Sequence, residues 1–173
     1  MAKIFEIYSK NQQGVDSNKV WYASSNIKYS ECIDNDNDFK TLKVVFNNGT
    51  QYQYNKVDVR QYLMFREDLS QGKALNKYIK GNNYEYIKLE DANLDELENE
   101  LNFRMEGGKF VFYDGETITL KDNKDAVIME KKVKLTKAAF DTVCSALEAV
   151  GNQLYTEGDN FSYDELNDDS KPF

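Results

Sequence analysis

The stretch from Leu42 to Tyr54 constrains the fold most, because it has the pattern of a β-hairpin. Apolar and aromatic residues alternate along both arms, with Leu42, Val44 and Phe46 on the first arm and Tyr52 and Tyr54 on the second. Such alternation places these side chains on one face of a pair of strands. The Asn-Asn-Gly sequence at 47–49 supplies the positive φ values of a tight turn. An antiparallel sheet built on this hairpin is therefore expected.

The hydrophobic period changes from two to about 3.6 after the hairpin. Asp58 is suited to cap a helix over about 59–67, and Ser70 is suited to cap a second helix over about 71–80 that ends at Gly81. Tyr84 to Leu89 predicts a short strand, and Asn93 with Glu96 predicts the start of a further helix. Two consecutive helices are expected to pack against the sheet.

Both ends of the chain add elements. Lys3 to Tyr8 alternates weakly and predicts an edge strand, whereas the polar residues 11–18 predict a loop. A second hairpin is expected around Asp114-Gly115, then a strand within 127–135 and an amphipathic helix over about 137–154. The predicted fold class is α+β: a hairpin-based antiparallel sheet with two consecutive helices, a second hairpin, a long C-terminal helix and an acidic tail.

The segment from Ser24 to about Tyr86 resembles a known family, the KTSC domain. The residues that match its pattern are Ser24, Ser25, Asn26, Ile27, Tyr29, Leu42, Val44, Phe46, Asn48, Gly49, Tyr52, Tyr54, Val57, Val59, Tyr62, Ser70, Gly72, Asn76 and Ile79. Asp58 stands where the family usually has proline, and both residue types begin helices well. The resemblance implies a non-enzymatic module that contacts RNA or another nucleic acid. Residues 91–173 match no family that we recognise.

The domain organisation expected from these patterns has three parts. Residues 1–90 form a KTSC-like module with an N-terminal strand, and residues 91–156 add a helix, a hairpin and a helix. Residues 157–173 are expected to be a flexible acidic tail, with six acidic residues and one lysine. Phe161, Tyr163 and Leu166 lie among those acids and could dock on a basic partner.

The composition argues against common forms of catalysis. The 173 residues include no histidine, which removes the usual general base near neutral pH and the Ser-His and Cys-His nucleophile pairs. Ser25 and Lys28 have the spacing of a nucleophile and its base, but that chemistry needs a helix and this segment reads as extended. Cys32 and Cys144 are expected to be buried, unreactive thiols. We therefore expect no enzyme activity and no cofactor.

A metal site is not expected either. Asp34, Asp36 and Asp38 have the first spacings of a calcium loop, but Phe39 and Val45 stand where that loop needs glycine and glutamate. The better interpretation is a solvated turn between two strands.

Basic residues are the main candidates for function. Lys73, Lys77 and Lys80 are spaced to share one helix face, and Arg60 and Arg66 lie on the preceding helix. Lys40 and Lys43 could extend the basic surface. Tyr52, Tyr54 and Tyr84 could stack on unpaired bases, although core packing is the alternative for these rings. Ser24, Ser25 and Asn26 form either a polar corner that bonds backbone groups or a contact for a phosphate.

Two hypotheses for function follow. The first is a non-catalytic binding module of KTSC type that contacts RNA or another nucleic acid through the basic helix face. The second starts from the uneven charge: residues 1–90 carry 13 Lys/Arg and 11 Asp/Glu, whereas residues 91–173 carry 9 and 19. The acidic half could bind a basic protein surface, as a phage-encoded inhibitor of a host or defence protein or as a minor virion component. The abundance of Asn, Lys, Tyr and Ile favours a bacteriophage origin.

The expected location follows from what the sequence lacks. No apolar run is long enough to span a membrane, and the N-terminal stretch does not resemble a signal peptide. We expect the chain in the cytoplasm, which is the host cytoplasm for a phage protein, with the virion as the alternative.

Overall fold

The computed structural model describes residues 3–10, 15–35, 39–152, 154–156 and 166. The chain divides into two compact units, residues 1–102 and residues 103–173. From the sequence, the first domain was expected to end at residue 90. The units divide later because the helix α3 (Leu94–Met105) packs Leu94, Leu97 and Leu101 on unit 1.

Unit 1 is built on a six-stranded antiparallel sheet whose spatial order is the order of the sequence. Its strands are β1 (Lys3–Lys10), β2 (Asp16–Tyr22), β3 (Ile27–Asp34), β4 (Phe39–Phe46), β5 (Gln51–Asp58) and β6 (Tyr86–Leu89). The predicted hairpin is confirmed: Leu42 pairs with Tyr54 and Val44 with Tyr52, and Gly49 in the turn has a φ of 94°. The α+β class is confirmed as well.

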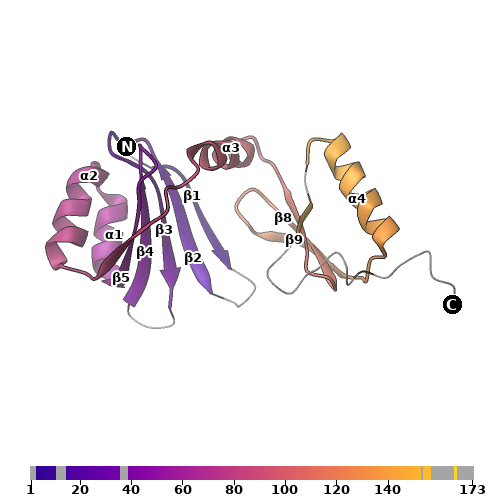
Figure 1. The fold of residues 1–173 in the computed structure, drawn as a ribbon, viewed down its shortest axis with the longest axis horizontal. Helices are drawn as coiled ribbons and strands as arrows, with labels where there is room; N and C mark the ends of the chain where they lie inside the picture. The colour runs from indigo at the N-terminus through magenta and orange to yellow at the C-terminus, as the bar shows by residue number, and fades with distance from the viewer. Residues whose placement is uncertain (1–2, 11–14, 36–38, 153, 157–165, 167–173) are drawn as a thin grey trace. The chain divides into compact units, whose positions relative to one another are not determined.

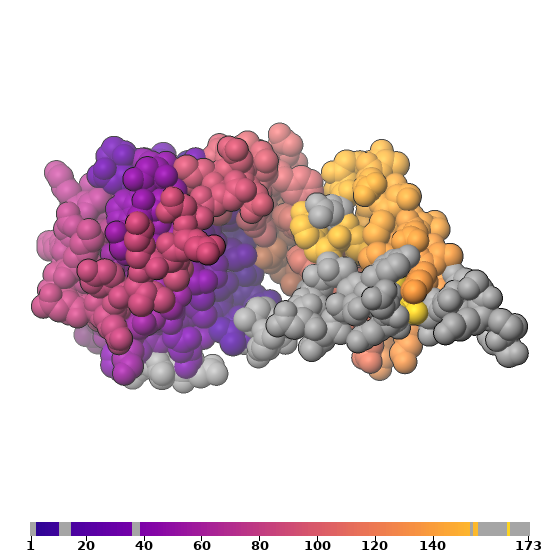
Figure 2. All heavy atoms as spheres, viewed as in Figure 1, coloured from indigo at the N-terminus to yellow at the C-terminus, as the bar shows by residue number. Residues whose placement is uncertain are grey.

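Helices cover one face of this sheet (Figure 1). α1 (Val59–Glu67) begins where Asp58 Oδ1 accepts a hydrogen bond from the Arg60 backbone N–H at 2.8 Å, as predicted. The second helix was expected to be regular up to Gly81. Instead α2 (Gln71–Ala74) widens into a π-helical turn, η1 (Leu75–Ile79), and closes with a 3₁₀ turn, η2 (Lys80–Asn82). The left-handed Asn83 (φ 56°, ψ 37°) ends this layer, which forms one side of unit 1 in Figure 2.

Apolar residues are buried on both faces of the sheet. On the helix-covered face, strand residues such as Leu42, Val44 and Val57 pack with Phe65 and Leu75. On the opposite face, a second cluster contains Ile7, Trp21, Tyr29 and Val45 together with Leu101 of α3. The indole N–H of Trp21 donates to the Leu97 carbonyl at 3.2 Å. Unit 1 is therefore a sheet between two helical layers.

The strand β2 corrects the sequence analysis, which expected a loop over 11–18. Residues 11–14 lie outside the described residues, but the strand begins at Asp16. Its polar residue Asn18 is only 6% exposed, and its buried amide donates to the Ile7 carbonyl at 3.2 Å and to Glu6 Oε2 at 3.1 Å. Its Oδ1 accepts from the Tyr62 hydroxyl and from Arg66. These hydrogen bonds let a polar sequence form an interior strand.

Unit 2 has a four-stranded sheet in the order β10-β7-β8-β9. Its elements are β7 (Phe110–Tyr113), β8 (Thr117–Lys121), β9 (Val127–Lys132), α4 (Lys137–Ala149) and β10 (Leu154–Thr156). The second hairpin is confirmed, and so is the C-terminal helix. The helix was expected to reach residue 154, but it ends at Ala149, and β10 then pairs in parallel with β7.

The core of unit 2 lies between its sheet and α4. Tyr113 and Leu154 are buried there against Phe140 and Leu147. Leu166, which was expected to belong to a docking tail, is 8% exposed and packs in the same cluster. The rest of the expected tail, with Phe161 and Tyr163, lies outside the described residues.

None of the described helices combines the length and the apolar composition that crossing a bilayer requires.

Candidate functional site

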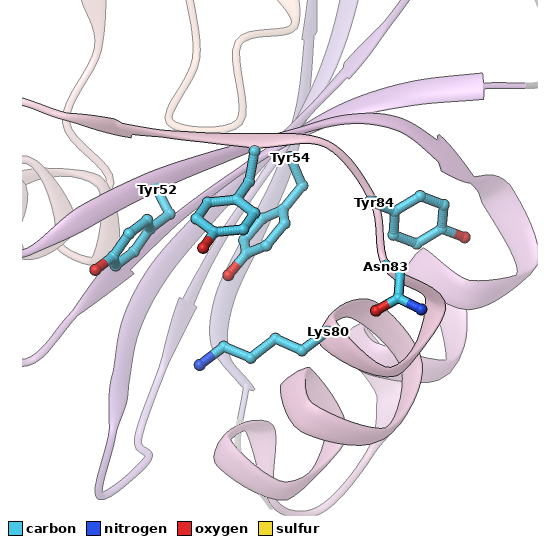
Figure 3. Close-up of a pocket in the computed structure, with 6 residues that line it drawn as sticks. Tyr52, Tyr54, Lys80, Asn83 and Tyr84 are labelled. Carbon is cyan, nitrogen blue, oxygen red and sulfur yellow. The ribbon is translucent and has the colours of Figure 1, made fainter.

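A pocket of about 430 Å³ opens in unit 1 where the helical layer ends. Figure 3 shows the side chains that surround it. Its lining residues are Tyr52 and Tyr54 of β5, Tyr86 of β6, Lys80 of η2, and Asn83 and Tyr84 of the connection between them. The volume lies in the range of small-molecule sites, roughly 300–1,000 Å³. Four aromatic rings, one cation and one amide therefore face a common space.

Strand geometry brings the tyrosines together. Tyr52 and Tyr54 are two residues apart on β5 and therefore share a face. Tyr86 pairs directly with Tyr54 across the β5–β6 ladder. The Tyr86 ring centroid lies 5.8 Å from that of Tyr54 and 6.0 Å from that of Tyr52. Tyr86 is also 60% exposed, so its ring is open to a ligand.

The helical layer supplies Lys80. The π-helical turn before it has more residues per turn than an α-helix, which changes the direction in which Lys80 leaves the helix. Figure 3 shows its side chain extending toward the hydroxyl ends of Tyr52 and Tyr54. Its ammonium lies 5.9 Å from the ring centroid of Phe46, which packs edge-on against Tyr52. Lys80 thus places a positive charge beside the aromatic wall.

The tyrosine hydroxyls have different roles. The Tyr84 hydroxyl accepts a hydrogen bond from the Asp58 backbone N–H at 3.2 Å, so it holds the connection against the start of α1. In Figure 3 it points away from Tyr52 and Tyr54. Burial, and then the neighbouring Tyr52 and Tyr86, raise the pKa of Tyr54. The Tyr54 hydroxyl therefore keeps its proton at neutral pH and can donate as well as accept.

Two further lysines lie on the helical layer outside the pocket. Lys73 and Lys77 are exposed, and the Lys77 ammonium lies 5.1 Å from the ring centroid of Tyr78. Arg60 is exposed on α1. Of the predicted site residues, the structure therefore brings four into one pocket, Tyr52, Tyr54, Tyr84 and Lys80. It leaves Lys73, Lys77 and Arg60 on the surface.

Arg66 does not belong to this surface. Its side chain is 13% exposed, and its guanidinium forms ion pairs with Glu6 at 3.0 Å and with Glu67 at 2.7 Å. It also donates to the Tyr8 hydroxyl and to Asn18 Oδ1. Burial alone would lower the pKa of Arg66, but the charge of Glu6 and the hydrogen bond to Glu67 outweigh it and raise that pKa. Arg66 joins α1 to β1 and β2.

Two other lysines do not extend the basic surface. Lys40 forms an ion pair with Asp34 at 2.8 Å, and Lys43 pairs across the sheet with Glu31 and Gln53. Lys88, which the sequence analysis did not select, pairs with Tyr52 and so shares the face of the pocket. The alternation of Tyr84, Tyr86 and Lys88 was a signal that Tyr86 and Lys88 share a face. The pairing of β6 with β5 had no local signal.

The polar corner at residues 24–26 has a structural role. Ser24 Oγ accepts hydrogen bonds from the backbone N–H groups of Asn26 at 3.2 Å and Ile27 at 3.3 Å. The Asn47 amide donates to the Ser24 carbonyl at 2.9 Å, which ties the corner to the β4–β5 turn. Asn26 also lies close to Gly72, where an added Cβ would stand 2.4 Å from Asn26 Nδ2. These contacts favour the corner over the phosphate contact.

Among the residues that the structure describes, the two thiols and the acidic side chains offer no second site. Cys32 is 7% exposed, and burial raises its pKa to about 12. Burial also raises the pKa of Cys144, which is half-buried on α4. The described residues contain no group of three Cys, Asp or Glu side chains placed to hold a metal ion. Asp36 and Asp38 lie outside the described residues.

The geometry defines a class of protein: a small α+β module whose antiparallel sheet carries an aromatic pocket beside its helices. The comparison of sequences then gives the family. Residues 23–84, from the residue after β2 to the pocket residue Tyr84, match the family model of the KTSC domain. No curated protein matches the chain. The bacteriophage origin stays a prediction.

Proposed function

We propose that this chain is a non-catalytic module that binds single-stranded RNA or another single-stranded nucleic acid through unit 1. The observation that carries the proposal is the pocket, in which Lys80 lies beside tyrosine rings, of which Tyr86 is exposed. Aromatic rings bind unpaired bases by stacking, and lysines bind the phosphates between them. Lys73 and Lys77 extend the cationic surface along the helical layer, and Lys88 adds a charge on the sheet.

The charge near the pocket favours nucleic-acid binding, although the net charge of the whole chain is negative. The formal net charge of −8 arises in residues 91–173, whereas residues 1–90 carry two more basic than acidic residues. Exposed charges farther apart than about 8–10 Å are largely screened at physiological salt. A phosphate at Lys80 therefore responds mainly to the nearby lysines.

Fluorescence anisotropy with a labelled single-stranded RNA of about 12 nucleotides tests the proposal. Three phosphate contacts to a single strand give a log–log salt slope of about −2, so raising the salt from about 50 to about 200 mM should weaken binding about 20-fold. The triple variant Lys73→Glu, Lys77→Glu, Lys80→Glu should abolish that binding and its salt dependence.

The matched control makes the same change of charge on unit 2, at the exposed lysines Lys131, Lys132 and Lys134. Binding should stay within about twofold of the unmodified chain, because these residues are not part of the proposed surface. Equal losses in both triple variants would show a general effect of charge and would refute the proposal. So would the absence of binding by the unmodified chain at low salt.

A further inference from the structure

We infer that the pocket holds one unpaired nucleotide of the bound strand, with its base against the Tyr86 ring and its phosphate at Lys80. This inference rests on the proposed function and assigns the chemistry of its site. The base is expected to pack on Tyr86 because this residue is the most exposed of the four tyrosines that line the pocket. Tyr86 is 60% exposed. Tyr54, by contrast, is 3% exposed and forms the floor.

The charge in the pocket selects the class of ligand. Rings arranged in this way can also bind quaternary ammonium groups. Lys80 places its own positive charge in the same space, and the lining residues include no carboxylate. A cationic ligand would be repelled, whereas an anion attached to a planar ring would satisfy both parts of the site.

Hydrogen-bonding groups distinguish a base from a plain aromatic anion. Tyr52, Tyr54 and Tyr86 provide hydroxyls that both donate and accept, and Asn83 provides an amide with both functions. The left-handed backbone of Asn83 ends the helical layer at the pocket wall. The polar edge of a nucleobase carries donors and acceptors that these groups can pair with. In a duplex that edge is already paired and the base is stacked, so a duplex cannot enter.

NMR titration of the full chain, labelled at its tyrosines, tests the inference with adenosine 5′-monophosphate as the probe. The signals of Tyr52, Tyr54 and Tyr86 should shift together on a saturable curve. Ribose 5-phosphate lacks the base and phenyl phosphate lacks the polar edge, so each should bind at least about fivefold more weakly. Phenyl phosphate that binds as well as the nucleotide would overturn the recognition of a base.

Two variants separate the parts of the site. Tyr86→Ala should weaken nucleotide binding about tenfold, and Tyr86→Phe should retain most of it if stacking dominates. Lys80→Gln should reduce binding of the monophosphate but not of adenosine. Tyr8→Ala is the matched control, because Tyr8 is also an exposed tyrosine of unit 1, at 65%, and lies on the opposite edge strand. It should leave nucleotide binding unchanged.

Binding measurements with single-stranded and duplex RNA distinguish failure of the inference from failure of the proposed function. Single-stranded RNA binding that Tyr86→Ala does not weaken, or duplex RNA that binds as tightly as the single strand, would overturn the inference and leave the proposed function standing. A nucleotide that binds in the pocket of a chain that does not bind RNA would support the nucleotide pocket and refute the proposed function. The variant Lys73→Glu, Lys77→Glu should weaken RNA binding and leave the mononucleotide unaffected.

Discussion

The sheet of unit 1 is covered by helices on both faces, whereas helix cover in unit 2 is described for one face only. In β2 the consecutive residues Val20, Trp21 and Tyr22 are all buried, which requires cover on both faces. In β9 all six residues are exposed, including Val127 at 57% and Met129 at 54%. Unit 1 leaves an opening where its helices stop, and this is where the pocket lies. A pocket can therefore form where a helical layer that covers a sheet comes to an end.

Reactivity of the two thiols should show the largest difference between the units. Reaction of Cys32 requires unit 1 to open, because it is buried and its pKa is raised to about 12. An opening that costs about 4 kcal/mol slows labelling about 1,000-fold. Labelling with a disulfide reagent at pH 8 should give a fast phase for Cys144 and a slow phase for Cys32.

Cys144→Ser should remove the fast phase only. Equal rates for the two thiols would break the comparison, since the buried Cys32 would then be as accessible as the half-buried Cys144.

Truncation of a core side chain should give the next largest effect. Leu42 is fully buried on β4, so Leu42→Ala should lower the free energy of unfolding of unit 1 by about 2–5 kcal/mol. The chain has one tryptophan, Trp21, and its fluorescence during urea denaturation reports on unit 1. Met129→Ala on β9 is the control and should change the stability of unit 2, followed by circular dichroism, by no more than about 0.5 kcal/mol. Similar losses would mean that β9 is covered in solution.

Gly72→Ala should destabilise unit 1 by no more than about 1 kcal/mol, because the new methyl group would meet the end of the exposed Asn26 side chain, which must move to make room. Asn26 is exposed, so Asn26→Ala alone should cost less. The double variant should recover most of the loss from Gly72→Ala, which a double-mutant cycle measures as a coupling energy. Additive changes in stability would show that Asn26 of the polar corner and Gly72 of α2 are not energetically coupled.

The smallest expected effect depends on pH. The hydrogen bond from Lys3, followed by that from Arg66, lowers the pKa of Glu67. A carboxyl with a lowered pKa stabilises the fold above its unfolded pKa, and this contribution is lost as the pH falls through its folded pKa. The chain should therefore be slightly more stable than its Glu67→Gln variant at pH 7, and the difference should vanish in acid. A difference that is independent of pH would exclude the charge of Glu67 as its cause.

Local signals in the sequence explain which elements were predicted. The Asn-Asn-Gly turn identified the β4–β5 hairpin, and Asp58 identified the start of α1. β2 was missed because Asn18 and its polar neighbours are buried through hydrogen bonds to residues distant in sequence, such as Tyr62 and Arg66. β10 was missed because it is three residues long and pairs with a strand about 40 residues earlier.

The candidate site was predictable only in part, because only some of its residues have a local signal in the sequence. Four of the six pocket residues, Tyr52, Tyr54, Tyr84 and Lys80, were selected from strand patterns and helix spacing. Tyr86 and Asn83 were not, because their place depends on the pairing of β6 with β5 and on the left-handed end of the helical layer. The ion pairs of Arg66 with Glu6 and Glu67 depend on packing between elements and also had no local signal.

The strand order of unit 1 has a consequence for folding kinetics. Strands that are consecutive in the sequence are neighbours in the sheet, so the pairings from β1 to β5 each close a short loop, whereas β6 joins β5 only after the helical layer of residues 59–82. Local pairing of β1 to β5 lowers the contact order and favours rapid folding of this part of the sheet. In unit 2, β10 must find β7 after the two other strands and α4 have been made. During synthesis, unit 1 can therefore complete its sheet while the residues that form β10 are still to be added.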